Sequence, residues 1–331
     1  MKRHPARVIA ILLAAAAITA VTAIPRPSSA NTLSSAVIGM FPKDTGEFAY
    51  ADLKAARKHP WFAQLQEQIL PSKLRLFEQF MRSAGVDPDT QVEELAWGVL
   101  PAGRQSPEEF VGVALGDFSP SASEAQFKQQ KLPVLESRGY HLYAFGSGSG
   151  PGDIFFFFID SNTAAFGQRE ALEKLLDVRF GLSDSLLRND KMASLVNEAN
   201  GAGLIWAVMD RNYSQIALQQ LLPQAEQFPQ AQAMISRIQA TILSVDASTD
   251  VDAKFQAVCA SPDDANLLAA ALQAGVMYRR YQEQQDGNVD MAKALESALV
   301  TPRGERLIVD LPVSNEQLVN LIRARAFAVP M

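Results

Sequence analysis

A run of consecutive apolar residues at positions 154–159 (IFFFFI) constrains the fold more than any other segment. Successive side chains of a strand point to opposite faces of its sheet, so Phe155 and Phe157 would share one face and Phe156 and Phe158 the other. A strand that is apolar on both faces must be covered on both faces, and the same run would promote aggregation if it were exposed. The run therefore predicts a central, buried strand.

The same run has a second interpretation, as the wall of a hydrophobic cavity. In that case the protein is a carrier of an apolar ligand, such as a lipid or an apolar peptide, in a cavity lined by residues 155–158. Phe156 and Phe158 are then the candidate ligand-binding residues. A closed apolar pocket beside Phe156 would favour this alternative.

The first 30 residues have the pattern of a secretory signal peptide. Lys2, Arg3 and Arg7 precede an apolar run at residues 8–23, and small residues allow cleavage after Ala23 or Ala30. The alternative is a retained anchor, but the run is shorter than the roughly 20 apolar residues that cross a bilayer core. We expect an exported protein, periplasmic or extracellular, without a stable membrane anchor after signal cleavage.

Composition excludes several classes of function. The chain has 48% hydrophobic and 20% charged residues, which is typical of a globular protein. Its formal net charge is −6, and residues 1–30 hold four basic and no acidic residues, so the remainder carries −10. An acidic chain without a basic cluster is a poor nucleic-acid binder. The single cysteine, Cys259, excludes Cys-based zinc motifs and intramolecular disulfides, and its apolar neighbours indicate a buried residue.

The order of expected elements predicts an α+β fold of two similar units, at residues 31–199 and 200–331. Each unit starts with a strand that ends in aspartate, at Asp52 and Asp210, and each contains a long helix opened by Ser-Pro, at Ser119 and Ser261. Both follow the order β-α-α-β-β-α, then further strands and a closing helix. Short connections between strands favour antiparallel sheets with helices packed on one face. We interpret the repeated order as an internal duplication.

The start of the first unit resembles uncharacterised exported proteins of environmental bacteria. The resemblance is carried by two segments, Phe41-Pro42-Lys43-Asp44-Thr45 and Phe48-Ala49-Tyr50-Ala51-Asp52-Leu53. That family has no assigned activity, so the resemblance implies export and the two-unit fold and nothing about chemistry.

No segment carries a cofactor motif, and we expect no cofactor. The glycine-rich residues 146–152 suggest a dinucleotide fingerprint, but the third glycine is out of register and a strand follows where a helix is needed. The serines are also one position away from those of a nucleophile elbow. The segment instead predicts a flexible connection within a hairpin.

Histidine is the residue on which hydrolase chemistry would depend. Beyond the signal, the chain has only His59, before a proline at a helix start, and His141, within a strand. No S-x-x-K spacing occurs. A Ser-His-Asp site around His141 is possible in principle, because such triads assemble from distant residues. A hydrolase using His141 is therefore a second alternative, and no other catalytic residue is assigned.

Two weak candidates for metal binding have simpler interpretations. Residues 286–290 begin like a calcium loop, but Met291 stands where that loop needs glycine and Ser297 where it needs a bidentate glutamate. They predict a polar turn between two helices, and no metal site. The second candidate is a hairpin turn, where aspartate is common for turn geometry alone; its aspartates are Asp246, Asp250 and Asp252.

The leading hypothesis is a non-enzymatic extracytoplasmic protein that acts through binding or has a structural role in the cell envelope. It rests on two histidines, one cysteine and no catalytic spacing in a chain long enough to fold well. The expected partner is an unknown protein or an apolar ligand, and neither nucleic acid nor a membrane.

Overall fold

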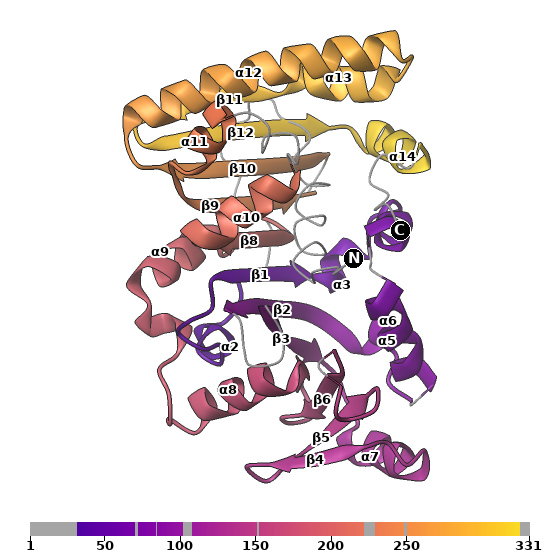
Figure 1. Cartoon of the computed structure of the whole chain (residues 1–331). Helices are drawn as coiled ribbons and strands as arrows, with labels where there is room; N and C mark the ends of the chain where they lie inside the picture. The colour runs from indigo at the N-terminus through magenta and orange to yellow at the C-terminus, as the bar shows by residue number, and fades with distance from the viewer. Residues whose placement is uncertain are drawn as a thin grey trace.

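The structure is a computed structural model that describes residues 32–69, 72–83, 85–101, 108–150, 152–221, 229–247 and 250–324. The described strands form a twelve-stranded sheet in the order β11-β12-β10-β9-β8-β1-β2-β3-β7-β6-β5-β4 (Figure 1). Each neighbouring pair is antiparallel. The expected α+β class is therefore confirmed.

Groups of strands and groups of helices follow one another along the described residues. The strands are β1 (Glu47–Asp52), β2 (Val92–Pro101), β3 (Glu108–Gly116), β4 (Val134–Ser137), β5 (Tyr140–Phe145), β6 (Ile154–Phe158), β7 (Thr163–Gly167), β8 (Ile205–Met209), β9 (Ile238–Asp246), β10 (Val251–Cys259), β11 (Leu299–Arg303) and β12 (Arg306–Val313). The helices are α2 (Ser35–Ile38), α3 (Leu53–Ala56), α4 (Phe62–Ile69), α5 (Ser72–Ser83), α6 (Pro88–Gln91), α7 (Pro120–Gln129), α8 (Arg169–Arg179), η1 (Leu186–Arg188), α9 (Asp190–Ala199), α10 (Arg211–Leu221), α11 (Pro229–Ile235), α12 (Pro262–Gln285), α13 (Val289–Ser297) and α14 (Asn315–Arg323).

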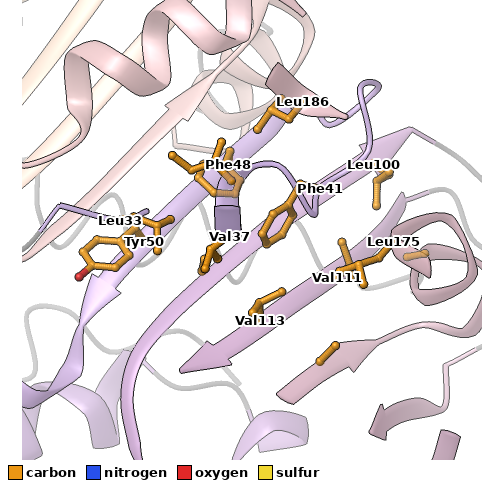
Figure 2. Close-up of a cluster of buried hydrophobic side chains, with 14 of the residues drawn as sticks. Leu33, Val37, Phe41, Phe48, Tyr50, Leu100, Val111, Val113, Leu175 and Leu186 are labelled. Carbon is orange, nitrogen blue, oxygen red and sulfur yellow. The ribbon is translucent and has the colours of Figure 1, made fainter. Parts of the chain in front are cut away.

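Helices cover both faces of the sheet, whereas the sequence suggested one face. On one face, α2, α8 and α9 pack on a cluster that includes Phe48 and Tyr50 of β1 (Figure 2). On the other face, Tyr213 of α10 packs against Ala49 of the same strand. The reason is that the central strands are apolar on both sides: all of β1 is buried. Such strands need cover on both faces.

The strand β6 is buried along its whole length, as the phenylalanine run predicts. Phe155 and Phe157 belong to the cluster under α8. Phe156 and Phe158 belong to the cluster on the opposite face, together with Phe127 of α7. The ring centroids of Phe127 and Phe156 lie 5.1 Å apart in an edge-to-face arrangement, so these side chains pack directly on one another.

The two halves of the chain meet at the centre of the sheet, where β1 pairs with β8. The backbone N–H of Asp52 donates to the carbonyl oxygen of Leu204 at 2.7 Å, and that of Asp210 donates to the carbonyl oxygen of Gly46 at 2.8 Å. These bonds occupy corresponding places at the two ends of the pair, whose middle is Ala49 opposite Ala207. One continuous sheet therefore joins the two halves.

Aspartate caps the helix that follows each of these strands. Asp52 accepts from the N–H of Ala55, and Asp210 from the N–H of Tyr213. Ser119-Pro120 and Ser261-Pro262 both open helices, but only the Ser261 side chain caps its helix by a hydrogen bond. The internal duplication and its boundary near residue 200 stay a prediction, which superposition of residues 31–199 on 200–331 tests.

The expected signal peptide, residues 1–30, lies outside the described residues. Within the part of the chain that is described, each helix is too short or too polar to span a bilayer.

Candidate functional site at the β4 end of the sheet

The two ends of the sheet differ in how their outer backbone groups are satisfied. At the β11 edge, the register of the β11–β12 hairpin directs the backbone groups of Val300 and Pro302 away from β12. The amide of Gln273 in α12 donates to the carbonyl oxygen of Val300 at 3.0 Å. Pro302 has no N–H to offer. This edge therefore offers fewer backbone groups for further strand pairing.

The opposite edge, β4, is created by a tight turn. Arg138 and Gly139 have φ angles of 49° and 82°, which is the left-handed pair of a type I′ turn. The turn folds β4 back onto β5 with Ser137 opposite Tyr140. Just before β4, the N–H of Ala144 donates to the carbonyl oxygen of Pro133 at 2.8 Å. This bond shows which residues turn their backbone groups toward β5 and which turn them away.

This alternation leaves backbone groups of β4 free to pair. Residues 133, 135 and 137 turn their backbone groups toward β5, so Val134 and Glu136 turn theirs toward the outside of the sheet. Val134 is 54% exposed and the Glu136 side chain 79% exposed. Two outward N–H groups and two outward carbonyl groups thus lie at a solvent-facing edge.

A pocket of about 400 Å³ lies directly beside this edge. Val134 and Glu136 face it from β4, and their cross-strand partners Tyr143 and His141 face it from β5. The end of α7 and the loop after it form the remaining wall. That wall consists of Lys128, Lys131 and Leu132. The lining therefore combines apolar groups with charges of both signs.

His141 lies between two carboxylates. Its Nε2 is 3.3 Å from Glu136 Oε1, and its Nδ1 is 3.9 Å from Glu124 Oε2 of α7. Among the described residues, no serine hydroxyl is bonded to either ring nitrogen. A nucleophile is what a Ser-His-Asp site requires. Both ring nitrogens of His141 therefore face carboxylate oxygens.

Tyr143 connects the pocket to the core below it. Its hydroxyl donates to Glu124 Oε2 at 3.3 Å, and burial, followed by the charge of Glu124, raises the pKa of Tyr143 to about 12. Its ring lies 4.9 Å from Phe127 and 6.1 Å from Phe156. At neutral pH, Tyr143 is thus an uncharged hydrogen-bond donor whose ring packs on Phe127 and Phe156.

The two candidate ligand-binding phenylalanines lie beneath this pocket. Phe156 and Phe158 are 3% and 8% exposed and pack against Phe127. Tyr143, and neither of these phenylalanines, lines the pocket.

The other residues singled out from the sequence lie elsewhere. His59 stacks on Trp61 at 5.3 Å, and Cys259 is buried, which raises the pKa of its thiol. The glycine-rich segment joins β5 to β6, where Asp153 accepts from the N–H of Gly150. Residues 286–288 form the turn between α12 and α13, and Val289 and Asp290 begin α13. Asp246 and Asp252 lie opposite each other at the β9–β10 turn. In the described part of the chain, no group of acidic, histidine or cysteine side chains is arranged to hold a metal ion.

Sequence reasoning missed most of this site. It identified His141 but placed no strand at β4 and assigned no role to Glu124, Lys128 or Tyr143. The signal that could have revealed β4 is Gly139 between two short runs containing leucine, because glycine at the second central position is typical of a two-residue type I′ turn.

Comparison with known proteins finds a likeness among solved structures. No protein-family model matches the chain, and no curated protein matches it. Among solved structures, the chain is similar to TP0453 in its crystal form I. The two share 12% sequence identity, the match covers 92% of this chain and 100% of that chain, and the TM-score is 0.45.

Proposed function

We propose that this chain is a non-enzymatic extracytoplasmic binding protein that captures an extended polypeptide segment at the β4 edge. The observation that supports the proposal is the outward backbone of Val134 and Glu136 beside the pocket around His141. Addition of a strand to an exposed sheet edge is a common mode of peptide recognition, in which main-chain bonds give affinity and pockets for alternate side chains give specificity.

The lining indicates which peptide would fit. A strand added to β4 would place every second side chain on the face that carries the pocket. Leu132, Val134 and Tyr143 would contact an apolar side chain, and Lys128 and Lys131 would favour a neighbouring acidic one. The preferred segment is therefore extended, with an apolar and an acidic residue two positions apart.

Export of the protein is part of the same proposal. It rests on the basic, apolar and small-residue order of residues 1–30 and on the resemblance to exported proteins.

The test uses octapeptides selected from a phage-displayed library on the intact protein. Hydrogen exchange then maps where they bind, and we expect new protection at Val134 and Glu136. Glu136→Pro removes an outward N–H that β5 does not use, so the hairpin should remain folded. We expect it to weaken peptide binding about tenfold. Glu136→Gln keeps the N–H and is the matched control, with binding near that of the wild type.

Two results would contradict the proposal. One is selected peptides that protect a segment other than β4. The other is equal binding to Glu136→Pro and the wild type, with circular dichroism showing that both proteins are folded.

A further inference from the structure

The helix α12 presents an apolar stripe to solvent. This 24-residue helix runs along the end of the molecule opposite β4 (Figure 1). Its inner side packs on the sheet and α13 through residues that include Ala265, Ala269 and Leu272. Its outer side carries large exposed side chains, with exposures of 48% to 71%; these are Leu267, Met277, Tyr278 and Tyr281.

The spacing of this stripe is that of a coiled-coil seam. Alternating steps of three and four residues join its members, which are Leu267, Ala270, Ala274, Met277 and Tyr281. Such 3-4 spacing places all of them on one side of a helix, at the a and d positions of a heptad. No charged residue occurs from Ala265 to Tyr278. Isolated apolar residues on a surface need no partner, but an aligned, uncharged stripe over about four turns marks an interface.

We propose that α12 pairs with α12 of a second copy of the chain in an antiparallel, two-fold dimer. In this direction the large residues of the stripe meet large residues and the alanines meet alanines. In antiparallel pairing each a position meets a d position, so Leu267 would meet Met277 of the second copy, and Ala270 would meet Ala274. The alanines at the centre allow close approach of the two helices. Parallel pairing would instead stack Met277 on Met277 and Tyr281 on Tyr281.

Charge favours the same direction. The first turn of α12 carries Asp263, and Arg279 and Arg280 lie in its C-terminal third, where they also pair with Glu283 and Glu296 of their own chain. In the antiparallel register, Asp263 meets Tyr281 of the second copy and lies next to its Arg280. Antiparallel helices also bring the positive end of each helix dipole near the negative end of the other.

The dimer leaves the proposed peptide site accessible. Because β4 lies at the other end of the sheet from α12 (Figure 1), a dimer through α12 would carry two β4 edges at its far ends. The dimer is nevertheless independent of the proposed function, since it involves other residues and another measurement.

The first experiment is sedimentation velocity over a range of protein concentrations. We expect reversible dimerisation of the wild type. Ala274→Glu should raise the dimer dissociation constant about tenfold or more, because it places an unpaired carboxylate at the centre of the interface. Ala274 is exposed and glutamate is a good helix former, so the monomer should stay folded. Gln284→Glu adds the same charge beyond Tyr281, the last residue of the stripe, and this variant should dimerise like the wild type.

Disulfide trapping then tests the direction of pairing. A mixture of Leu267→Cys and Met277→Cys should cross-link on oxidation. Neither variant alone should do so, since like positions would lie about 15 Å apart along the antiparallel pair, beyond disulfide reach. The native Cys259 is buried and contributes little background.

Three results would overturn this proposal. They are a monomer at every concentration, a dimer that Ala274→Glu leaves intact, and cross-linking of Leu267→Cys with itself. A monomer would mean that the stripe does not bind a second copy of the chain. An unaffected dimer would place the interface elsewhere, and cross-linking of Leu267→Cys with itself would mean parallel pairing.

Discussion

Truncation of the phenylalanine strand distinguishes a packed core from a ligand cavity. Phe155 and Phe157 are 3% and 1% exposed on one face of β6, and Phe156 and Phe158 are 3% and 8% exposed on the other. Replacing a well-packed phenylalanine by alanine typically costs about 3–5 kcal/mol, the sum of lost transfer free energy and an unfilled cavity. All four substitutions to alanine should therefore lower the free energy of unfolding substantially.

The loss of stability is expected to differ among the four substitutions. Phe157 is almost fully buried beneath α8, so its truncation should fall at the upper end of that range. Phe158 retains some exposure and should fall at the lower end. A typical domain is stable by about 5–15 kcal/mol, so each variant should lose a large part of the total without necessarily unfolding.

The assay is urea denaturation of the four single variants, with Phe180→Ala as the control. Phe180 is 51% exposed, so its truncation should change stability by less than about 1 kcal/mol. Near-neutral effects at Phe156 and Phe158, with large effects at Phe155 and Phe157, would refute the core interpretation of that face. They would place the carrier of an apolar ligand ahead of the peptide-binding proposal.

Two further predictions concern the buried acid of β3 and the N-terminus. Glu109 is 2% exposed, and burial, followed by the charge of Glu170, raises its pKa. Its protonated form is thus favoured by folding, and this contribution to stability is lost as pH rises through the raised pKa. Glu109→Gln should therefore stabilise the protein at about pH 7 and have little effect below about pH 4; equal effects at both pH values in denaturant melts would contradict this. N-terminal sequencing of the exported protein should begin at Ile24 or Asn31, and retention of Met1 on membrane-bound protein would disprove signal cleavage.

The sequence determined several local features because the responsible residues are neighbours in the chain. The apolar run made β6 a buried strand, since no face of it could remain in water. Asp52, Asp210 and Ser261 each begin a helix, because a short oxygen-bearing side chain satisfies an N–H group of the first turn. Alternation and short turns predicted the antiparallel hairpins and the α+β class.

The elements that sequence reasoning missed depend on partners more than on their own residues. β4 is short, and its four residues alternate between exposed and half-buried positions, so it carries little apolar signal. It is a strand because the turn at Arg138 and Gly139 holds it against β5. α9 (Asp190–Ala199) was also missed, although its side chains Met192 and Val196 belong to the central core.

The pocket around His141 and the exposed stripe of α12 depend on tertiary structure. Residues from α7, β4 and β5 form the pocket around His141, and Glu124 reaches that histidine from a separate element. In the sequence, the uncharged stretch from Ala265 to Tyr278 is compatible with a fully buried helix, and only its packing shows which stripe faces water.

The pairing of β1 with β8 also depends on contacts between residues that are distant in the sequence. Backbone groups at a strand edge can pair with those of any other strand, so the sequence of a strand does not determine which strand lies next to it. The sequence thus specified the strongly apolar strands, such as β6, and the faces that they bury. The choice of partners came from the packing of the whole chain, which left the β4 edge unpaired and the α12 stripe exposed.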